Sequence, residues 1–146
     1  MTTKPAQSER ALQRQVAAYF AAVLDPVQVL YFHPMNEGKR GRWAQQDFKL
    51  GGGLAGVADW MLSWKANSFG WYPAVAWLEL KSPTAPKKLP VAQEAFRQRV
   101  RRLGHYHAVC RDLDAVVAAL HGWGVPTLEH TILPGGGLRY RPKVPA

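Results

Sequence analysis

The stretch that decides the fold begins Gly-Gly-Gly-Leu-Ala-Gly-Val-Ala-Asp-Trp at 51–60 and ends Trp-Leu-Glu-Leu-Lys at 77–81. Around these two ends, the segments Val57 to Trp64 and Val75 to Lys81 are rich in aliphatic and aromatic residues, which predicts two strands. Each predicted strand also contains an acidic residue, where a simply buried strand normally has none. We interpret the rest of the chain around these two strands.

Three ionisable side chains are expected to meet where these strands pair. Side chains two residues apart in a strand share a face, so Glu79 and Lys81 project together, with Trp77 behind them. Asp59 stands near the start of the earlier strand, just after the glycine-rich turn. If the strands are neighbours, two carboxylates and one ammonium group converge, and we expect the active site there.

The remaining segments predict a small α/β layer fold in one domain, which suits a chain of 146 residues. Apolar periodicity predicts the helices, and short aliphatic runs predict the strands. The expected order is a helix from Gln7 to Leu24, a strand from Val27 to Phe32, the two strands above, a helix from about Pro90 to Leu103, a strand from Tyr106 to Cys110 and a helix from Asp112 to about His121. The core of the domain is expected over about residues 7–123.

The net charge of the chain indicates which kind of binding partner to expect. The chain has 19 Lys and Arg residues against 10 Asp and Glu, which leaves a net charge of +9. A domain this basic most often binds polyanions, and nucleic acid is the first candidate. The alternative is a basic, solvated surface without such a partner.

The cellular compartment follows from features that the sequence lacks. Its single cysteine, Cys110, excludes an internal disulfide and indicates a reducing compartment. The segment Met1 to Arg10 is polar and has no signal-peptide core, and no apolar run approaches the ~20 residues that cross a bilayer. We therefore expect a soluble cytoplasmic protein that does not bind membranes.

Two polar residues fall on helix faces that should be apolar. Glu9 lies in the apolar stripe of the first helix, and Gln93 in the stripe of the helix that begins near Pro90. A buried carboxylate is costly unless it is paired, so Glu9 either reaches solvent from a frayed first turn or belongs to a site. Gln93 either bonds a nearby backbone group or belongs to that site. The pattern leaves these alternatives open.

Basic residues gather near the expected site. The segment Asn36 to Lys49 is predicted to be a polar loop, and its cations surround Trp43. Such a loop is usually solvated, but this mixture also suits DNA phosphates and an exposed base. We favour DNA contacts by residues of this loop, of the connection from Ser82 to Lys88 and of the following helix, namely Lys39, Arg40, Arg42, Lys49, Lys87, Lys88 and Arg97. The basic tail rich in Pro and Gly, 133–146, could be disordered, bind DNA or pack on a partner subunit.

Two other kinds of site are disfavoured. Gly51, Gly53 and Gly56 satisfy the G-x-G-x-x-G pattern, but a dinucleotide fingerprint needs a strand before it and a helix after it. Here a polar loop precedes the glycines and a strand is predicted to follow. His105 and His107 have the spacing of two zinc ligands on a strand, yet no further Cys or His has matching spacing.

The expected cluster suits a hard divalent cation. Mg²⁺ binds oxygen ligands, commonly one or two carboxylates with phosphate and water. Asp59 and Glu79 supply the carboxylates, and the Leu80 carbonyl is a candidate third ligand. The cation would acidify a water molecule and neutralise charge on a scissile phosphate. Lys81 would orient that water or stabilise the added charge. In a basic protein, this trio favours a metal-dependent phosphodiesterase.

Asp59 followed by Glu79-Leu80-Lys81 resembles the PD-(D/E)xK nuclease motif, and the wider pattern resembles the VRR-NUC family (virus-type replication-repair nuclease) of that superfamily. The resemblance spans about Glu9 to Trp123 and rests on Glu9, His33-Pro34-Met35-Asn36, Gly53 to Asp59, Trp77 to Lys81, Leu89 to Gln93 and Gly104-His105-Tyr106. The chain departs from it in having Ala58 where the superfamily name has proline, and Pro90 where relatives tend to have a serine cap.

The resemblance implies a restriction-endonuclease-like fold, a mixed β-sheet flanked by helices. It implies that Asp59 and Glu79 hold Mg²⁺ or Mn²⁺, that Lys81 assists the attacking water and that Gln93 supports the site. Glu9 would join the metal shell directly or through water. These implications favour a site role for both Glu9 and Gln93.

The resemblance also implies an activity. Similar stand-alone proteins are bacterial or phage nucleases, so we expect a Mg²⁺-dependent endonuclease that cuts branched DNA, such as Holliday junctions or flaps, in replication, recombination or repair. By the same analogy the protein is expected to be a homodimer, with two sites facing two strands. The alternative from another class is an accessory protein of the same fold that binds nucleic acid without cleaving it.

Overall fold

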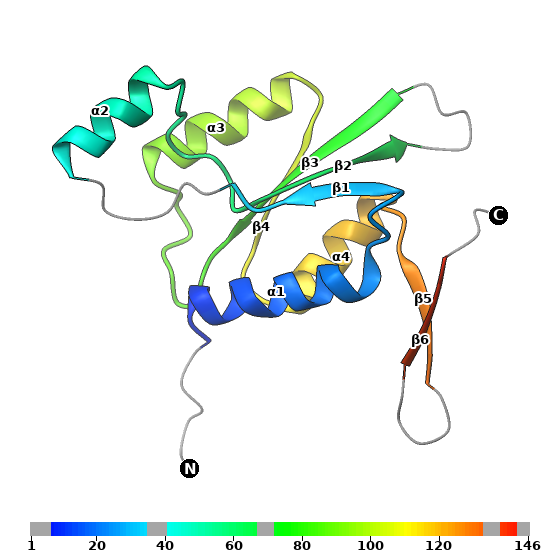
Figure 1. The fold of residues 1–146 in the computed structure, drawn as a ribbon. Coiled ribbons are helices and arrows are strands. Elements are labelled where there is room, and N and C mark those ends of the chain that lie inside the picture. Colours follow the sequence, from blue (N-terminus) through cyan, green and yellow to red (C-terminus); the bar gives the residue numbers. More distant parts are fainter. Residues whose placement is uncertain (1–6, 35–40, 67–71, 133–137, 143–146) are drawn as a thin grey trace, which may run out of the picture.

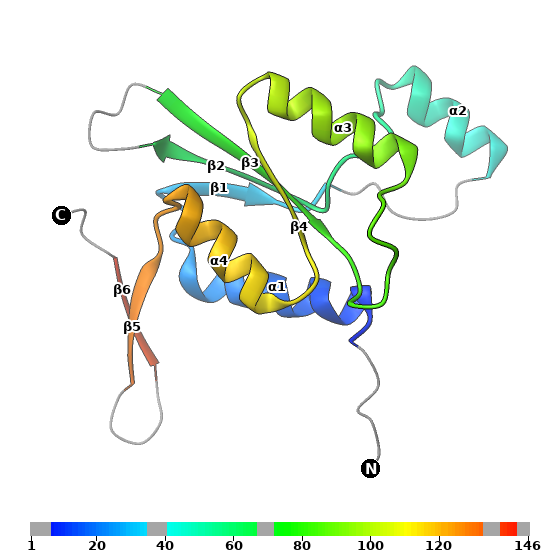
Figure 2. The same ribbon diagram turned by 180° about the vertical axis from the view of Figure 1, so that it is seen from behind.

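Four strands form one mixed sheet, and helices lie on both of its faces (Figure 1, Figure 2). The computed structural model describes residues 7–34, 41–66, 72–132 and 138–142, with side chains as far as Leu128. The elements are α1 (Glu9–Val23), β1 (Val29–Phe32), α2 (Arg42–Leu50), β2 (Trp60–Ala66), β3 (Tyr72–Leu80), α3 (Val91–Arg102), β4 (Tyr106–Cys110), α4 (Leu113–Trp123), β5 (Leu128–Ile132) and β6 (Leu138–Pro142). The prediction of an α/β protein is confirmed at this level.

The order of strands in the sheet is β1-β2-β3-β4. β1 pairs with β2 and β2 with β3 in antiparallel fashion, whereas β3 and β4 are parallel. A parallel pair needs a crossover connection, and α3 provides it. β3 therefore has a strand neighbour on each side as far as Leu78, and its last two residues, Glu79 and Leu80, pair with β4 alone.

The larger hydrophobic core lies between the sheet and the helices α1 and α4. The apolar stripe predicted for the first helix is buried as expected, because Leu12, Val16, Phe20 and Val23 all face this core. The hydroxyl of Ser8 caps α1 by accepting from the Ala11 N–H at 3.1 Å. The face of the sheet that packs against α1 and α4 therefore forms the main hydrophobic core.

The opposite face of the sheet is covered by α3 through a smaller apolar cluster. Ala58, Phe96 and Val100 are buried there, with Trp77 packed against them. Leu103, where the helix was expected to end, follows the last residue of α3 and is 73% exposed. The smaller cluster leaves room for polar side chains at this face.

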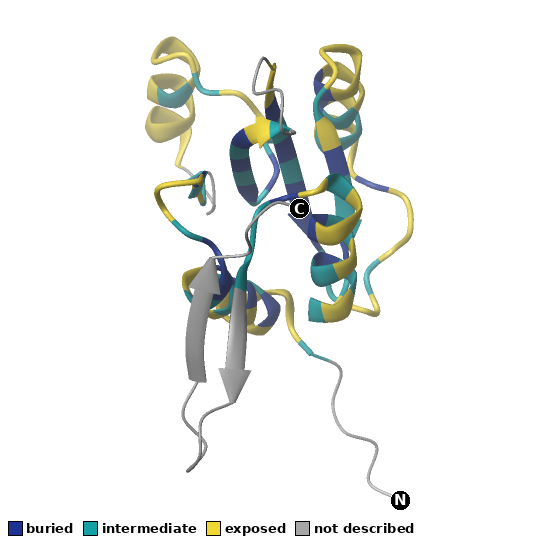
Figure 3. Cartoon of the chain, turned by 90° about the vertical axis from the view of Figure 1, so that its right-hand side faces the viewer, coloured by how far each residue is buried: buried dark blue, intermediate teal, exposed yellow. Residues whose placement is uncertain are grey.

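The structure differs from the sequence prediction in several places; β1 begins at Val29 rather than Val27, and β3 begins at Tyr72 rather than Val75. Residues 42–50 form the helix α2, where we expected a loop; α2 buries no residue (Figure 3). The first strand of the predicted pair begins at Trp60 rather than at Val57. The preceding residues run along α3 instead, because Ala58 packs against Phe96 and Val100.

The sequence left the structure of the tail, residues 133–146, open, and within it residues 133–137 and 143–146 lie outside the described part of the chain. Residues 138–142 form β6, which pairs with β5 in a separate antiparallel hairpin. The sequence contains a usable signal, since the residues Pro-Gly-Gly-Gly precede alternating apolar and basic residues from Leu138 to Arg141. Among the described helices, none combines the length and apolar character that spanning a bilayer requires.

Candidate active site

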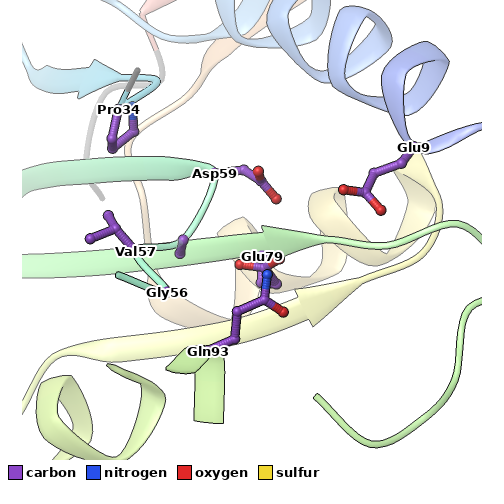
Figure 4. Close-up of a pocket in the computed structure, with 8 residues that line it drawn as sticks. Glu9, Pro34, Gly56, Val57, Asp59, Glu79 and Gln93 are labelled. Carbon is purple, nitrogen blue, oxygen red and sulfur yellow. The ribbon is translucent and has the colours of Figure 1, made fainter. Parts of the chain in front are cut away.

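The acidic residues singled out in the sequence line one cavity of about 180 Å³. Glu9, Asp59 and Gln93 point into a common space from three separate parts of the chain (Figure 4). The complete lining is Glu9, Pro34, Gly56, Val57, Ala58, Asp59, Glu79 and Gln93. Sites for drug-sized ligands have volumes of about 300–1,000 Å³, so this cavity suits an ion with its water molecules better than a large organic molecule.

Asp59 is held against the end of β3. The pairing of β2 with β3 ends at Trp60 and Leu78, so the Leu80 N–H has no main-chain partner from β2. The Asp59 carboxylate takes that place, because its Oδ2 accepts from the Leu80 N–H at 2.6 Å. The His33 imidazole donates through Nδ1 to the main-chain carbonyl of Asp59. Asp59 is thus positioned by β1 and β3 together.

Glu79 and Lys81 share a face, as their spacing predicts. The Lys81 Nζ lies 3.0 Å from Glu79 Oε1, and both side chains are largely buried. Lys81 follows the last residue of β3, but its N–H still donates to the Cys110 carbonyl at 3.0 Å. This bond extends the pairing with β4 by one residue and keeps Lys81 on the face of Glu79.

The pKa of Glu79 is raised to about 7. The main cause is burial, since the side chain is 2% exposed, and the charge of Asp59 raises the pKa further. The hydrogen bond and charge of Lys81 oppose this shift, while Glu9 adds a smaller increase. A buried carboxyl group near a second one favours a bound proton or a cation.

Gln93 and Glu9 complete the lining. The Oε1 of Gln93 is buried and has no hydrogen-bond partner among the described residues. Gln93 therefore does not satisfy a backbone group through this oxygen, which was one of the two alternatives. Glu9 is exposed at the start of α1 and also lines the cavity, so it reaches both solvent and the site.

Neutral oxygens have to contribute if this cavity holds a metal. Within the described part of the chain, no three His, Cys, Asp or Glu side chains are grouped to hold a metal ion. Besides Glu9, the side-chain oxygens available to a metal in the cavity are therefore the carboxylates of Asp59 and Glu79 and the amide oxygen of Gln93. The Leu80 side chain faces the core and its N–H is bound to Asp59, so only its carbonyl remains a predicted ligand.

The predicted DNA-contact residues are spread over three segments. Lys39 and Arg40 lie outside the described residues. The other predicted residues on α2 and in the connection to α3, namely Arg42, Lys49, Lys87 and Lys88, are all exposed. Arg97 instead makes an ion pair with Glu94 at 2.8 Å, which lowers the pKa of Glu94 and partly neutralises the cation.

The two histidines considered for zinc have separate environments. His105 Nδ1 accepts from the Trp77 Nε1–H at 3.1 Å, whereas His107 is buried against Phe96. Burial lowers the pKa of His107 to about 4, and nearby Arg101 and Arg97 contribute. His107 is therefore a neutral core residue near neutral pH.

Some residues of the site were not singled out for these contacts from the sequence. His33 was quoted only as part of the motif His33-Pro34-Met35-Asn36, yet its ring supports Asp59. Gly56 was assigned to a flexible turn, yet it lies against the first turn of α3. No local pattern reveals such contacts, because each joins segments that are distant in sequence.

No protein-family model, curated protein or solved structure matches this chain. Any functional assignment therefore depends on the residues and geometry of the cavity.

Proposed function

We propose that this protein is a Mg²⁺- or Mn²⁺-dependent endonuclease of the VRR-NUC type, with a restriction-endonuclease-like fold, that cuts branched DNA. The observation that supports it most is that Asp59, Glu79 and Gln93 line one cavity (Figure 4), with Lys81 paired to Glu79. The mixed sheet with a crossover helix between β3 and β4 agrees with such a fold.

The donor atoms fit a hard divalent cation. The carboxylates of Asp59 and Glu79 offer charged oxygens, and the buried Oε1 of Gln93 is an acceptor without a partner among the described residues. Mg²⁺ commonly uses one or two carboxylates and completes its shell with water and phosphate oxygens. When bound, the cation would neutralise charge on the scissile phosphate and lower the pKa of a water molecule.

The chain's own residues have distinct roles in this proposal. Asp59 and Glu79 hold the cation, and the Leu80 carbonyl adds a third oxygen. Lys81 has three N–H donors and uses one on Glu79, so it can donate another to the attacking water or to a phosphate oxygen. Glu9 acts through a water molecule at the mouth of the cavity, since no three acidic side chains of the described residues form one ligand set.

The positive charge supports DNA as the substrate. A net charge of +9 attracts polyanions, and Arg42, Lys49, Lys87 and Lys88 are exposed. Branched DNA, a homodimeric assembly and a bacterial or phage-infected cytoplasm follow from the family resemblance. They are part of the proposal on that ground alone.

The proposal is tested with labelled four-way junctions, flaps and linear duplexes in the presence of Mg²⁺. We expect cutting of the branched substrates, abolished by EDTA and reduced about a hundredfold or more in Asp59→Asn and Glu79→Gln. Asp59→Asn keeps an oxygen that can accept from the Leu80 N–H, so it removes charge while preserving this contact. Asp114→Asn, an exposed carboxylate on α4, serves as the control and should cut normally.

DNA binding without Mg²⁺-dependent cuts would contradict the nuclease proposal and favour the accessory protein. Equal cutting by wild type and Asp59→Asn would mean that the activity resides elsewhere or in a contaminant.

A further inference from the structure

Gly56 makes an unusually close backbone contact beside the cavity. A Cβ atom at this position would lie 2.2 Å from the Ala92 carbonyl oxygen, 2.3 Å from the Ala92 carbonyl carbon and 2.7 Å from the Gln93 nitrogen. These are main-chain atoms of the first turn of α3, so they cannot move aside as a flexible side chain would. Gly56 also has a φ of 78°, in the left-handed region that favours glycine.

The contact joins the two halves of the cavity. Gly56 precedes Asp59 by three residues, and the α3 turn that it touches carries Gln93. Between them, Ala58 is buried against Phe96 of the same helix. The segment before Asp59 is therefore packed onto α3, while the Asp59 carboxylate is bound to β3.

We propose that Gly56 is a positioning residue: its backbone contact with α3 sets the separation between Asp59 and Gln93 across the cavity. A side chain at this position needs at least 3.0 Å from its neighbours, so the loop and α3 would move apart by about 1 Å. A displacement of that size near a reacting centre reduces rates by about a hundredfold. The inference rests on the proposed cation-dependent function, because it concerns the same ligands.

Gly52 offers a matched control in the same loop. Its φ of 82° is nearly that of Gly56, but a Cβ atom at Gly52 would meet nothing within 4 Å. Gly52→Ala therefore introduces the same unfavourable backbone conformation without the clash. Any effect of Gly56→Ala beyond that of Gly52→Ala reports the contact with α3.

The experiment measures single-turnover cutting of a labelled junction against Mg²⁺ concentration for both variants. Gly56→Ala is expected to cut about a hundredfold more slowly and to need at least tenfold more Mg²⁺ for its half-maximal rate. Its affinity for the junction in EDTA should stay within threefold of wild type, because the substitution removes no positive charge. Gly52→Ala should match wild type in all three measurements. A normal Mg²⁺ requirement in Gly56→Ala, or an equal loss in Gly52→Ala, would overturn the inference.

A second variant keeps the test informative if Gly56→Ala does not fold. Pro90→Gly loosens the first turn of α3 without adding a clash, so the Mg²⁺ requirement should rise in the same direction. An unchanged requirement in Pro90→Gly would then refute the inference.

Mn²⁺ binding without DNA separates the two proposals, with free Mn²⁺ followed by electron paramagnetic resonance. Wild type that binds Mn²⁺ but cuts no DNA refutes the nuclease; weaker binding by Gly56→Ala would still support positioning. Wild type that neither cuts nor binds Mn²⁺ refutes both.

Discussion

The pKa of Glu79 is set by opposing influences: burial and the charge of Asp59 raise it, whereas Lys81 lowers it. The Glu79 side chain is 2% exposed, and the adjacent Asp59 carboxylate adds repulsion, so the pKa is raised to about 7 despite the ion pair with Lys81. An ionised Glu79 is therefore unfavourable in the folded protein unless a further positive charge arrives. The raised pKa of Glu79 is therefore a reason to expect that a cation binds here. It also makes the stability of the metal-free protein depend on pH.

The metal-free protein should lose stability as pH rises between about 4.5 and 7. In the unfolded chain Glu79 releases its proton near the ordinary pKa of 4.5, whereas in the folded protein it retains the proton up to about 7. The unfolded state binds fewer protons across this window, so the free energy of unfolding falls with rising pH. At about 1.4 kcal/mol per pKa unit, the loss is about 3 kcal/mol.

Urea unfolding in EDTA at several pH values measures this contribution. In Glu79→Gln the decline should be smaller by that amount, because a neutral amide does not titrate. Asp114→Asn should keep the pH dependence of wild type, since this carboxylate is exposed. Identical pH profiles for wild type and Glu79→Gln would show that burial does not shift Glu79 as described.

Among the secondary-structure elements, the connection from β3 to α3 is held by one side chain from the end of β4. The Arg111 guanidinium donates to the carbonyls of Ser82 at 3.0 Å, Ala85 at 2.8 Å and Pro86 at 3.0 Å. Its planar arrangement of donors suits three acceptors at once, which a lysine ammonium on a flexible stem matches poorly. Arg111 thereby restrains the segment between the strand of Glu79 and the helix of Gln93.

Arg111→Lys should destabilise the protein and loosen this connection. Loss of two of the three bonds should lower the free energy of unfolding by about 1–3 kcal/mol. The Ala85 amide, which donates to the Ser82 carbonyl at 3.1 Å, should exchange its hydrogen faster. Arg99→Lys, an exposed change on α3, is the control for urea unfolding and hydrogen exchange. Unchanged exchange at Ala85 in Arg111→Lys would contradict this role.

For the whole molecule, the excess of positive charge predicts how DNA binding depends on salt. A protein that neutralises several phosphates releases counterions, so the logarithm of its affinity falls linearly with the logarithm of salt concentration, by about 0.9 per phosphate contact on duplex DNA. Lys87 and Lys88 are exposed in the connection between β3 and α3. Replacing both with alanine should reduce the slope by about 2.

Fluorescence anisotropy of a labelled junction in EDTA, across a range of salt concentrations, measures the slope. Arg14→Ala is the control, because Arg14 is exposed on α1, a helix that covers the opposite face of the sheet from α3. A shallow slope for wild type, or the same decrease in Arg14→Ala, would contradict a DNA surface around α3.

The sequence by itself determined the elements with a buried face and the group of residues at the site. The helices α1, α3 and α4 have apolar stripes, and period-two spacing assigned Glu79 and Lys81 to one face, since such patterns follow from local backbone geometry. α2 and the β5–β6 hairpin were missed, because residues 36–49 were interpreted as a polar loop and residues 133–146 as a tail.

Only the tertiary structure decided how the site is held. The bond from Asp59 to the Leu80 N–H, the contact of Gly56 with α3 and the three bonds of Arg111 each join residues from separate segments. The pKa of Glu79 likewise depends on burial by the folded chain. Such contacts have no local period, because they exist only once distant segments pack against each other.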